Sequence, residues 1–178
     1  MKNLINWNKI PVYTFKGKNL TQPYDIVNFM TKNKIDDYVY IIDVIKNNVN
    51  YRAKIGMSAD QSRDYGDRLY RQIAHLKSWR KQRILSSSGA EFVIIEELFK
   101  KKYKFTLSHK DCHFTIYGMT NYPYVGFVPR NEILALEETL ILEHEIKYGH
   151  KPVGNLLESY SYIDKAIVSK MHFEKFFD

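Results

Sequence analysis

YVYIIDVIKNNVNYRAKIG, residues 38–56, is the stretch of sequence that decides the fold. Residues 38–45 form an apolar run rich in β-branched side chains, and residues 51–55 can return beside it as a partner strand. The intervening residues 46–48, Lys-Asn-Asn, are polar and typical of a tight turn. The stretch therefore predicts an antiparallel β-hairpin.

Polar side chains stand at matching ends of the two predicted strands. Tyr38-Val39-Tyr40 opens the first strand, and Lys54-Ile55-Gly56 closes the second. This pattern places a phenol and an amine on adjacent strands, with a glycine where the second strand leaves the sheet. Tyr40 or Lys54 alone would indicate only an ordinary hairpin, so the motifs that follow along the chain carry the functional argument.

Bulk properties narrow the class of protein. A chain of 178 residues fits one domain with a core of its own. The formal net charge of +7 favours polyanionic partners such as nucleic acid. A single cysteine, Cys112, excludes an internal disulfide framework and fits a reducing compartment. Because no signal peptide or long apolar run is found, we expect a cytoplasmic protein without a membrane partner.

The segments around the hairpin complete an α+β prediction. Residues 25–30 form a short helix in an N-terminal arm, residues 1–35, which either packs on the core, as we expect, or reaches for DNA. Residues 90–98 form a short segment with β-branched side chains at its centre, and this pattern predicts a third strand. Residues 103–124 are typical of an insertion with a strand or hairpin around residues 114–117. The expected fold is a small central antiparallel sheet of about three strands, flanked by helices, with an inserted hairpin.

The segment from about Asp67 to Gln82 has the spacing of an amphipathic helix. Apolar residues recur at i, i+4 and i+7, at Leu69, Ile73 and Leu76. A neighbouring polar stripe consists of Arg68, Arg71, Gln72 and His75. Because these four polar side chains share one stripe, either arginine could reach a common site.

A later helix begins near Asn131, a good N-cap residue. Its apolar residues are spread nearly all round its circumference, and this pattern predicts a buried helix. Glu137 and Glu138 would then be buried carboxylates, which need a counterion, hydrogen bonds or a metal. This helix is therefore a candidate source of a metal ligand.

The order of these motifs resembles the GIY-YIG nuclease superfamily over roughly residues 36–155. In that family a strand ending in Gly-Ile-Tyr pairs with one ending in Tyr-Ile-Gly, one helix supplies an arginine, and another supplies a metal-binding glutamate. Here no glycine precedes Tyr38, and Lys54 replaces the second tyrosine. That replacement resembles the small type II restriction endonucleases of the superfamily, as does the run 138–143 that leads to Lys-Pro-Val-Gly at 151–154.

The resemblance implies roles for the hairpin and the later helix. Glu138, with Glu137 as the alternative, would hold Mg²⁺ or Mn²⁺. Tyr40 would orient or deprotonate the attacking water. Lys54 would favour the phenolate, since a positive charge within ~4 to 6 Å lowers the pKa of an acid.

The resemblance also implies an arginine that stabilises the phosphate, and two registers compete for it. Arg68 with Gln72 keeps the Arg-Leu pair of the family, and Arg71 with His75 keeps its arginine and histidine. We favour Arg68 as the catalytic arginine, with His75 in support.

The function that the resemblance implies is metal-dependent hydrolysis of phosphodiester bonds, with restriction-type, site-specific cleavage of double-stranded DNA. A two-fold palindromic target would require a homodimer. The alternatives are a repair, recombination or single-strand nuclease, or a catalytically degenerate nucleic-acid-binding protein. The expected organisation is the arm at 1–35, the nuclease core at 36–155 and a C-terminal helical extension at 156–178.

Overall fold

The structure is a computed structural model. It describes residues 10–22, 24–35, 37–58, 69–71, 73, 84–85, 87–118, 130–155 and 163–164. Within these ranges no helix is both long enough and apolar enough to cross a membrane.

The predicted hairpin is confirmed. Strand β2 (Tyr38–Lys46) pairs antiparallel with β3 (Val49–Ser58), and Lys46 lies opposite Val49. The two turn residues, Asn47 and Asn48, have φ angles of 51° and 64°. Positive φ at both central residues is the mark of a type I′ turn, whose twist matches that of the flanking strands, and asparagine tolerates it well. The local sequence therefore sets the strand register.

The hairpin belongs to an antiparallel sheet with the strand order β1-β5-β2-β3. Strand β1 (Val12–Lys16) comes from the N-terminal arm, and β5 (Cys112–Gly118) contains the strand expected around residues 114–117. Because β5 pairs with both β1 and β2, it joins the arm to the hairpin. Two short strands, β4 (Ile84–Leu85) and β6 (Ile163–Asp164), form a separate pair. The fold is thus α+β, and the arm packs on the core through β1.

The prediction of a third strand at residues 90–98 is wrong. This segment lies in helix α3 (Ser87–Lys102). Its buried apolar side chains recur at i, i+1, i+4 and i+5, at Ile94, Ile95, Leu98 and Phe99. That spacing places them on one face of a helix, whereas a strand would alternate buried and exposed residues. Packing of this face against the sheet outweighs the β preference of a short branched run.

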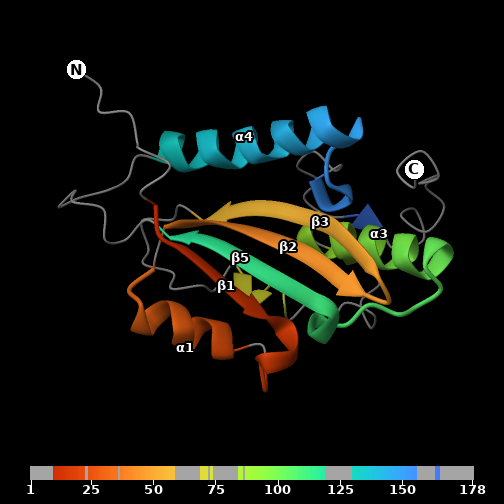
Figure 1. Ribbon diagram of the computed structural model, residues 1–178, viewed down its shortest axis with the longest axis horizontal. Helices are drawn as coiled ribbons and strands as arrows, with labels where there is room; N and C mark the ends of the chain where they lie inside the picture. Colours follow the sequence, from red (N-terminus) through yellow and green to blue (C-terminus); the bar gives the residue numbers. More distant parts are fainter. Residues whose placement is uncertain are drawn as a thin grey trace.

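The helices cover both faces of the sheet. Helix α1 (Asp25–Lys32) and α3 share a core with alternate residues of β2, among them Tyr38, Tyr40 and Ile42. Helix α4 (Arg130–Tyr148) packs on the residues between them, Val39 and Ile41. Figure 1 shows α4 along one side of the sheet and α1 on the other. Because neighbouring residues of a strand point to opposite faces, the two cores are separated by the sheet.

The prediction that α4 is buried on every side is wrong. Ile133 and Leu136 face the sheet, but Leu142 and Ile146 are 54% and 76% exposed. A helix that lies on one face of a sheet buries only the stripe that touches it. Apolar residues all round the helix are therefore compatible with a helix that is half exposed.

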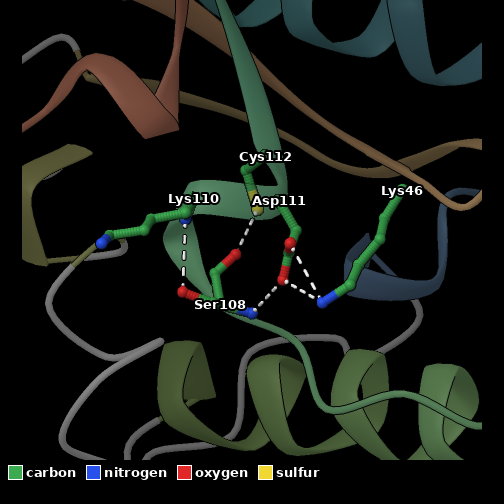
Figure 2. A network of polar contacts seen from close by, with 5 residues as sticks. All are labelled: Lys46, Ser108, Lys110, Asp111 and Cys112. Carbon is green, nitrogen blue, oxygen red and sulfur yellow. Dashed lines mark hydrogen bonds and ion pairs between the residues drawn. The ribbon is translucent and has the colours of Figure 1, made fainter.

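A polar network fixes the start of β5 (Figure 2). The carboxylate of Asp111 accepts a hydrogen bond from the Ser108 backbone N–H and, at 3.1 Å, pairs with the amine of Lys46 at the end of β2. Ser108 and Asp111 form a capping box around the short 3₁₀ helix η4 (His109–Asp111). This network connects the end of β2 to the chain entering β5, and so helps to set the register of β5.

Candidate functional site

Tyr40 and Gly56 lie directly opposite each other on β2 and β3. The ring of Tyr40 rests on the glycine, since a Cβ atom at position 56 would lie 2.4 Å from both the Cζ and the phenol oxygen of Tyr40. Tyr40 is completely buried. The glycine of the Lys54-Ile55-Gly56 motif is therefore needed to seat the tyrosine, which gives this pairing a steric reason.

Lys54 lies on the same sheet face as Tyr40, because its partner across the hairpin is Ile42, two residues further along β2. Its side chain is only 7% exposed and forms an ion pair with Glu91 of α3. The same amine donates a hydrogen bond of 3.1 Å to the carbonyl oxygen of Gly154. We call Tyr40, Lys54, Gly56, Glu91 and Gly154 the Lys54 cluster.

The segment after α4 closes this cluster through the 3₁₀ helix η5 (Val153–Asn155). Asn155 accepts a hydrogen bond from the Ile55 backbone N–H at 2.9 Å and donates one to the Ile55 carbonyl at 2.6 Å. These bonds occupy backbone groups on the edge strand β3, which would otherwise be open to pairing. A Cβ atom at Gly154 would lie 2.8 Å from the Ala53 carbonyl oxygen, so only glycine fits there.

Tyr38 connects the sheet to the helical segment that includes residues 69–71. Its phenol oxygen accepts a hydrogen bond of 3.1 Å from the Leu69 backbone N–H, and Leu69 and Ile73 are buried in the same core. Arg71 is exposed in this segment. Arg68, Gln72 and His75 lie outside the described residues, so both registers proposed for the catalytic arginine stay predictions.

The structure does not bring Glu138 together with Tyr40 and Lys54. Glu138 is exposed on α4, and Glu137 beside it is half-buried. Helix α4 packs on the sheet face of Val39 and Ile41, whereas Tyr40 and Lys54 face the opposite side. The premise that Glu138 is a buried carboxylate is wrong, because the stripe of α4 that includes it is turned to solvent.

The carboxylate that the fold places in the cluster is Glu91, which sequence reasoning missed. A strand over residues 90–98 does not predict it, because only the helical spacing of α3 turns Glu91 toward Lys54. A second signal was available in Lys54, since a buried lysine needs an acidic partner. The partnership also changes the electrostatics at Tyr40, because Glu91 offsets the positive charge that was expected to favour the phenolate.

Glu91 is the only carboxylate in the Lys54 cluster, and therefore its only anionic ligand for a hard metal cation. Within the described ranges, no three His, Cys, Asp or Glu side chains are grouped to hold a metal ion. Mg²⁺, however, is commonly held by one or two carboxylates, with water and substrate phosphates completing the octahedron. Glu91 supplies one such carboxylate, but it is buried and paired with Lys54, so a metal ion here would have to displace the Lys54 amine.

Comparisons with protein-family models, curated proteins and solved structures find no significant match to this chain.

Proposed function

We propose that this protein is a metal-dependent endonuclease that hydrolyses phosphodiester bonds in DNA, with the Lys54 cluster as its active site. The observation that carries the proposal is the seating of Tyr40 on Gly56 beside the buried Lys54–Glu91 pair. A buried ion pair gains little stability over well-packed apolar residues, so its presence in a core favours a functional reason. The net charge of +7 is compatible with a polyanionic substrate.

Each residue of the cluster has a chemical role in this proposal. Tyr40 would orient the attacking water and take part in proton transfer through its phenol oxygen. Lys54 would hold the Glu91 carboxylate in place on the sheet face that Lys54 shares with Tyr40. Glu91 would hold Mg²⁺ or Mn²⁺, which when bound supplies positive charge to the phosphate and leaving oxygen. An arginine of the segment 67–82 would contact a non-bridging phosphate oxygen.

The substrate class follows the resemblance to the small restriction endonucleases. We propose double-stranded DNA cut at a specific site, and a palindromic target would call for a homodimer. A repair, recombination or single-strand nuclease would use the same residues on a different DNA form.

The second candidate is a nucleic-acid-binding protein without catalytic activity. Two observations favour it. Tyr40 is completely buried, and the Lys54 amine is already occupied by Glu91 and the Gly154 carbonyl. A cluster closed in this way could be purely structural, with the basic surface of the protein contacting phosphates.

Cleavage of supercoiled plasmid in Mg²⁺ distinguishes these functions. The wild-type protein should cut the plasmid, and EDTA should abolish cutting. Glu91→Gln and Tyr40→Phe should each lower the single-turnover rate by about 100-fold or more, since each removes a group that acts on the transition state. Glu143→Gln, an exposed change of the same kind on α4, serves as the control. Circular dichroism confirms that each variant is folded.

Three other outcomes would contradict this proposal. If Glu138→Gln is inactive while Glu91→Gln cuts normally, the metal-binding carboxylate is on α4 and the Lys54 cluster is structural. If the wild-type protein shifts DNA without cutting it, the binding function replaces the nuclease. Unchanged cutting in all variants would reject the active site proposed here.

A further inference from the structure

The sheet face beyond α4 contains a groove of about 630 Å³. It lies over the ends of β1, β5 and β2, on the side opposite the Lys54 cluster. Cross-strand register places four side chains in one row across the sheet. Lys16 lies opposite His113, His113 lies opposite Asp43, and Asp43 lies opposite Arg52. With strands about 4.8 Å apart, this row is roughly 14 Å long.

The charges along the row are unevenly compensated. Asp43 and Arg52 form an ion pair of 3.0 Å, so the acidic residue already has a cationic partner. Lys16 and Lys18 at the other end of the row are exposed and line the groove. Four neutral hydrogen-bonding residues also line the groove, Thr14, Asn19, Asn50 and Thr115, together with the apolar residues Phe15, Ile45 and Phe114. The groove is therefore mostly polar, with excess positive charge at its β1 end.

The lysine-bearing end of the groove is held in place by packing. Gly17 lies between the two lysines in the short helix η2 (Gly17–Asn19), and a Cβ atom there would lie 1.8 Å from the His109 carbonyl oxygen. Helix η2 thus rests directly on η4, which the Ser108–Asp111 capping box fixes in turn (Figure 2). This packing fixes the backbone from which the two lysines project, so less backbone entropy is lost on binding.

We propose that this groove binds the phosphates of a nucleic-acid strand, independently of the Lys54 cluster. Two lysines at one end of a row about 14 Å long suit a chain of phosphates, because the chain can continue along the row past the first phosphate. The hydroxyl and amide side chains between them can donate to phosphate and sugar oxygens. Because the groove and the Lys54 cluster lie on opposite faces, strand binding here needs no cleavage and survives if the proposed nuclease function fails.

His113 gives the groove a built-in reporter. Partial burial lowers the pKa of its imidazole, and the charges of Lys16 on β1 and Lys18 on η2 lower it further, while Asp43 on β2 acts in the opposite direction. A bound phosphate would favour the imidazolium and raise this pKa. Proton uptake would then accompany binding, so affinity should increase as pH falls from about 8 to about 6.

The test measures binding in EDTA, where metal-dependent cleavage cannot occur. Fluorescence anisotropy follows labelled single-stranded and duplex DNA of about 20 units, longer than the ~4–16 nucleotides that a single-strand-binding module covers. Lys16→Gln/Lys18→Gln should weaken single-strand binding about 10-fold and reduce the slope of log affinity against log salt by about 1.4. Lys32→Gln/Lys34→Gln, an exposed pair with the same spacing at the C-terminal end of α1, is the matched control and should change affinity less than about 2-fold.

Nuclear magnetic resonance of His113 decides whether the strand occupies the groove. Its imidazole pKa should rise when DNA is added, and inorganic phosphate at the same phosphate concentration should have a smaller effect. Equal losses in the two double-lysine variants, or an unchanged His113 pKa, would overturn the proposal. An equal response to inorganic phosphate would show that the groove binds single phosphate groups and not a strand. Because binding is measured in EDTA, where metal-dependent cleavage cannot occur, the outcome of this test is separate from that of the nuclease test.

Discussion

Lys54 and Glu91 form a buried ion pair in which each charged side chain depends on the other. A lysine at the end of a hairpin strand is ordinarily a solvated side chain, yet Lys54 is buried on the sheet face that it shares with Tyr40. Its charge is tolerated there because Glu91 and the Gly154 carbonyl satisfy the amine. The desolvation cost of both ions must be balanced by this geometry, so removing either partner leaves an uncompensated charge.

This balance predicts a large coupling between the two residues. Lys54→Met and Glu91→Met should each lower the free energy of unfolding by about 3 kcal/mol, whereas the double variant should lie within about 1 kcal/mol of the wild type. Urea denaturation of the four proteins measures the coupling. The half-exposed pair Arg52–Asp43 is the control, and its cycle should give less than about 1 kcal/mol. Additive effects at Lys54 and Glu91 would show that the pair is not energetically coupled in solution.

At the level of elements, the hairpin was predictable because its signals are local. An apolar run, a polar turn and a return strand lie within 38–56, and the two asparagines suit the positive φ angles of the turn. Helix α1 was predictable for the same reason, since Asp25 accepts hydrogen bonds from the Thr21 and Gln22 backbone N–H groups at its start. Helix α3 was not, because its short β-branched run suits a strand until the sheet that it packs on is known.

The turn between β2 and β3 can be tested by substitution at Asn48. Asn48→Gly should raise the free energy of unfolding by about 0.5 kcal/mol, because glycine has no steric penalty at a φ of 64°. Asn48→Val should lower it by about 1 kcal/mol or more, since a β-branched residue is strained there. Thermal unfolding of both variants measures the shifts. Asn50→Gly, in the adjoining strand, should be destabilising, and a stabilising effect there would contradict the turn assignment.

At the level of the whole molecule, the strand order could not be predicted from the sequence. Strand β5 follows β3 by more than fifty residues, yet it lies between β1 and β2. Nothing local in residues 112–118 specifies those partners. The strand order also determines which acidic residue can reach the candidate site, because α3 and α4 pack on opposite faces of the sheet. Glu91 of α3 reaches Lys54, whereas Glu138 of α4 is exposed on the other side.

The central position of β5 makes Cys112 a reporter of global unfolding. This lone cysteine is completely buried in the main core at the start of β5, and burial raises the pKa of its thiol. Both effects suppress the thiolate that alkylating reagents attack. If β5 is released only when the whole sheet opens, then iodoacetamide should label native protein at least about 1,000-fold more slowly than unfolded protein. Labelling across a urea series, read by mass spectrometry, should then coincide with the circular dichroism transition.

A local opening would give a different result. Asp111→Asn weakens the pair with Lys46 that secures the start of β5, so this variant should label faster in native buffer with little change in the urea midpoint. Lys147→Gln, an exposed charge change in the last turn of α4, should leave the labelling rate unchanged. If the wild-type protein is already labelled rapidly in native buffer, then β5 opens on its own. The central strand would in that case not be the cooperative link between the arm and the hairpin.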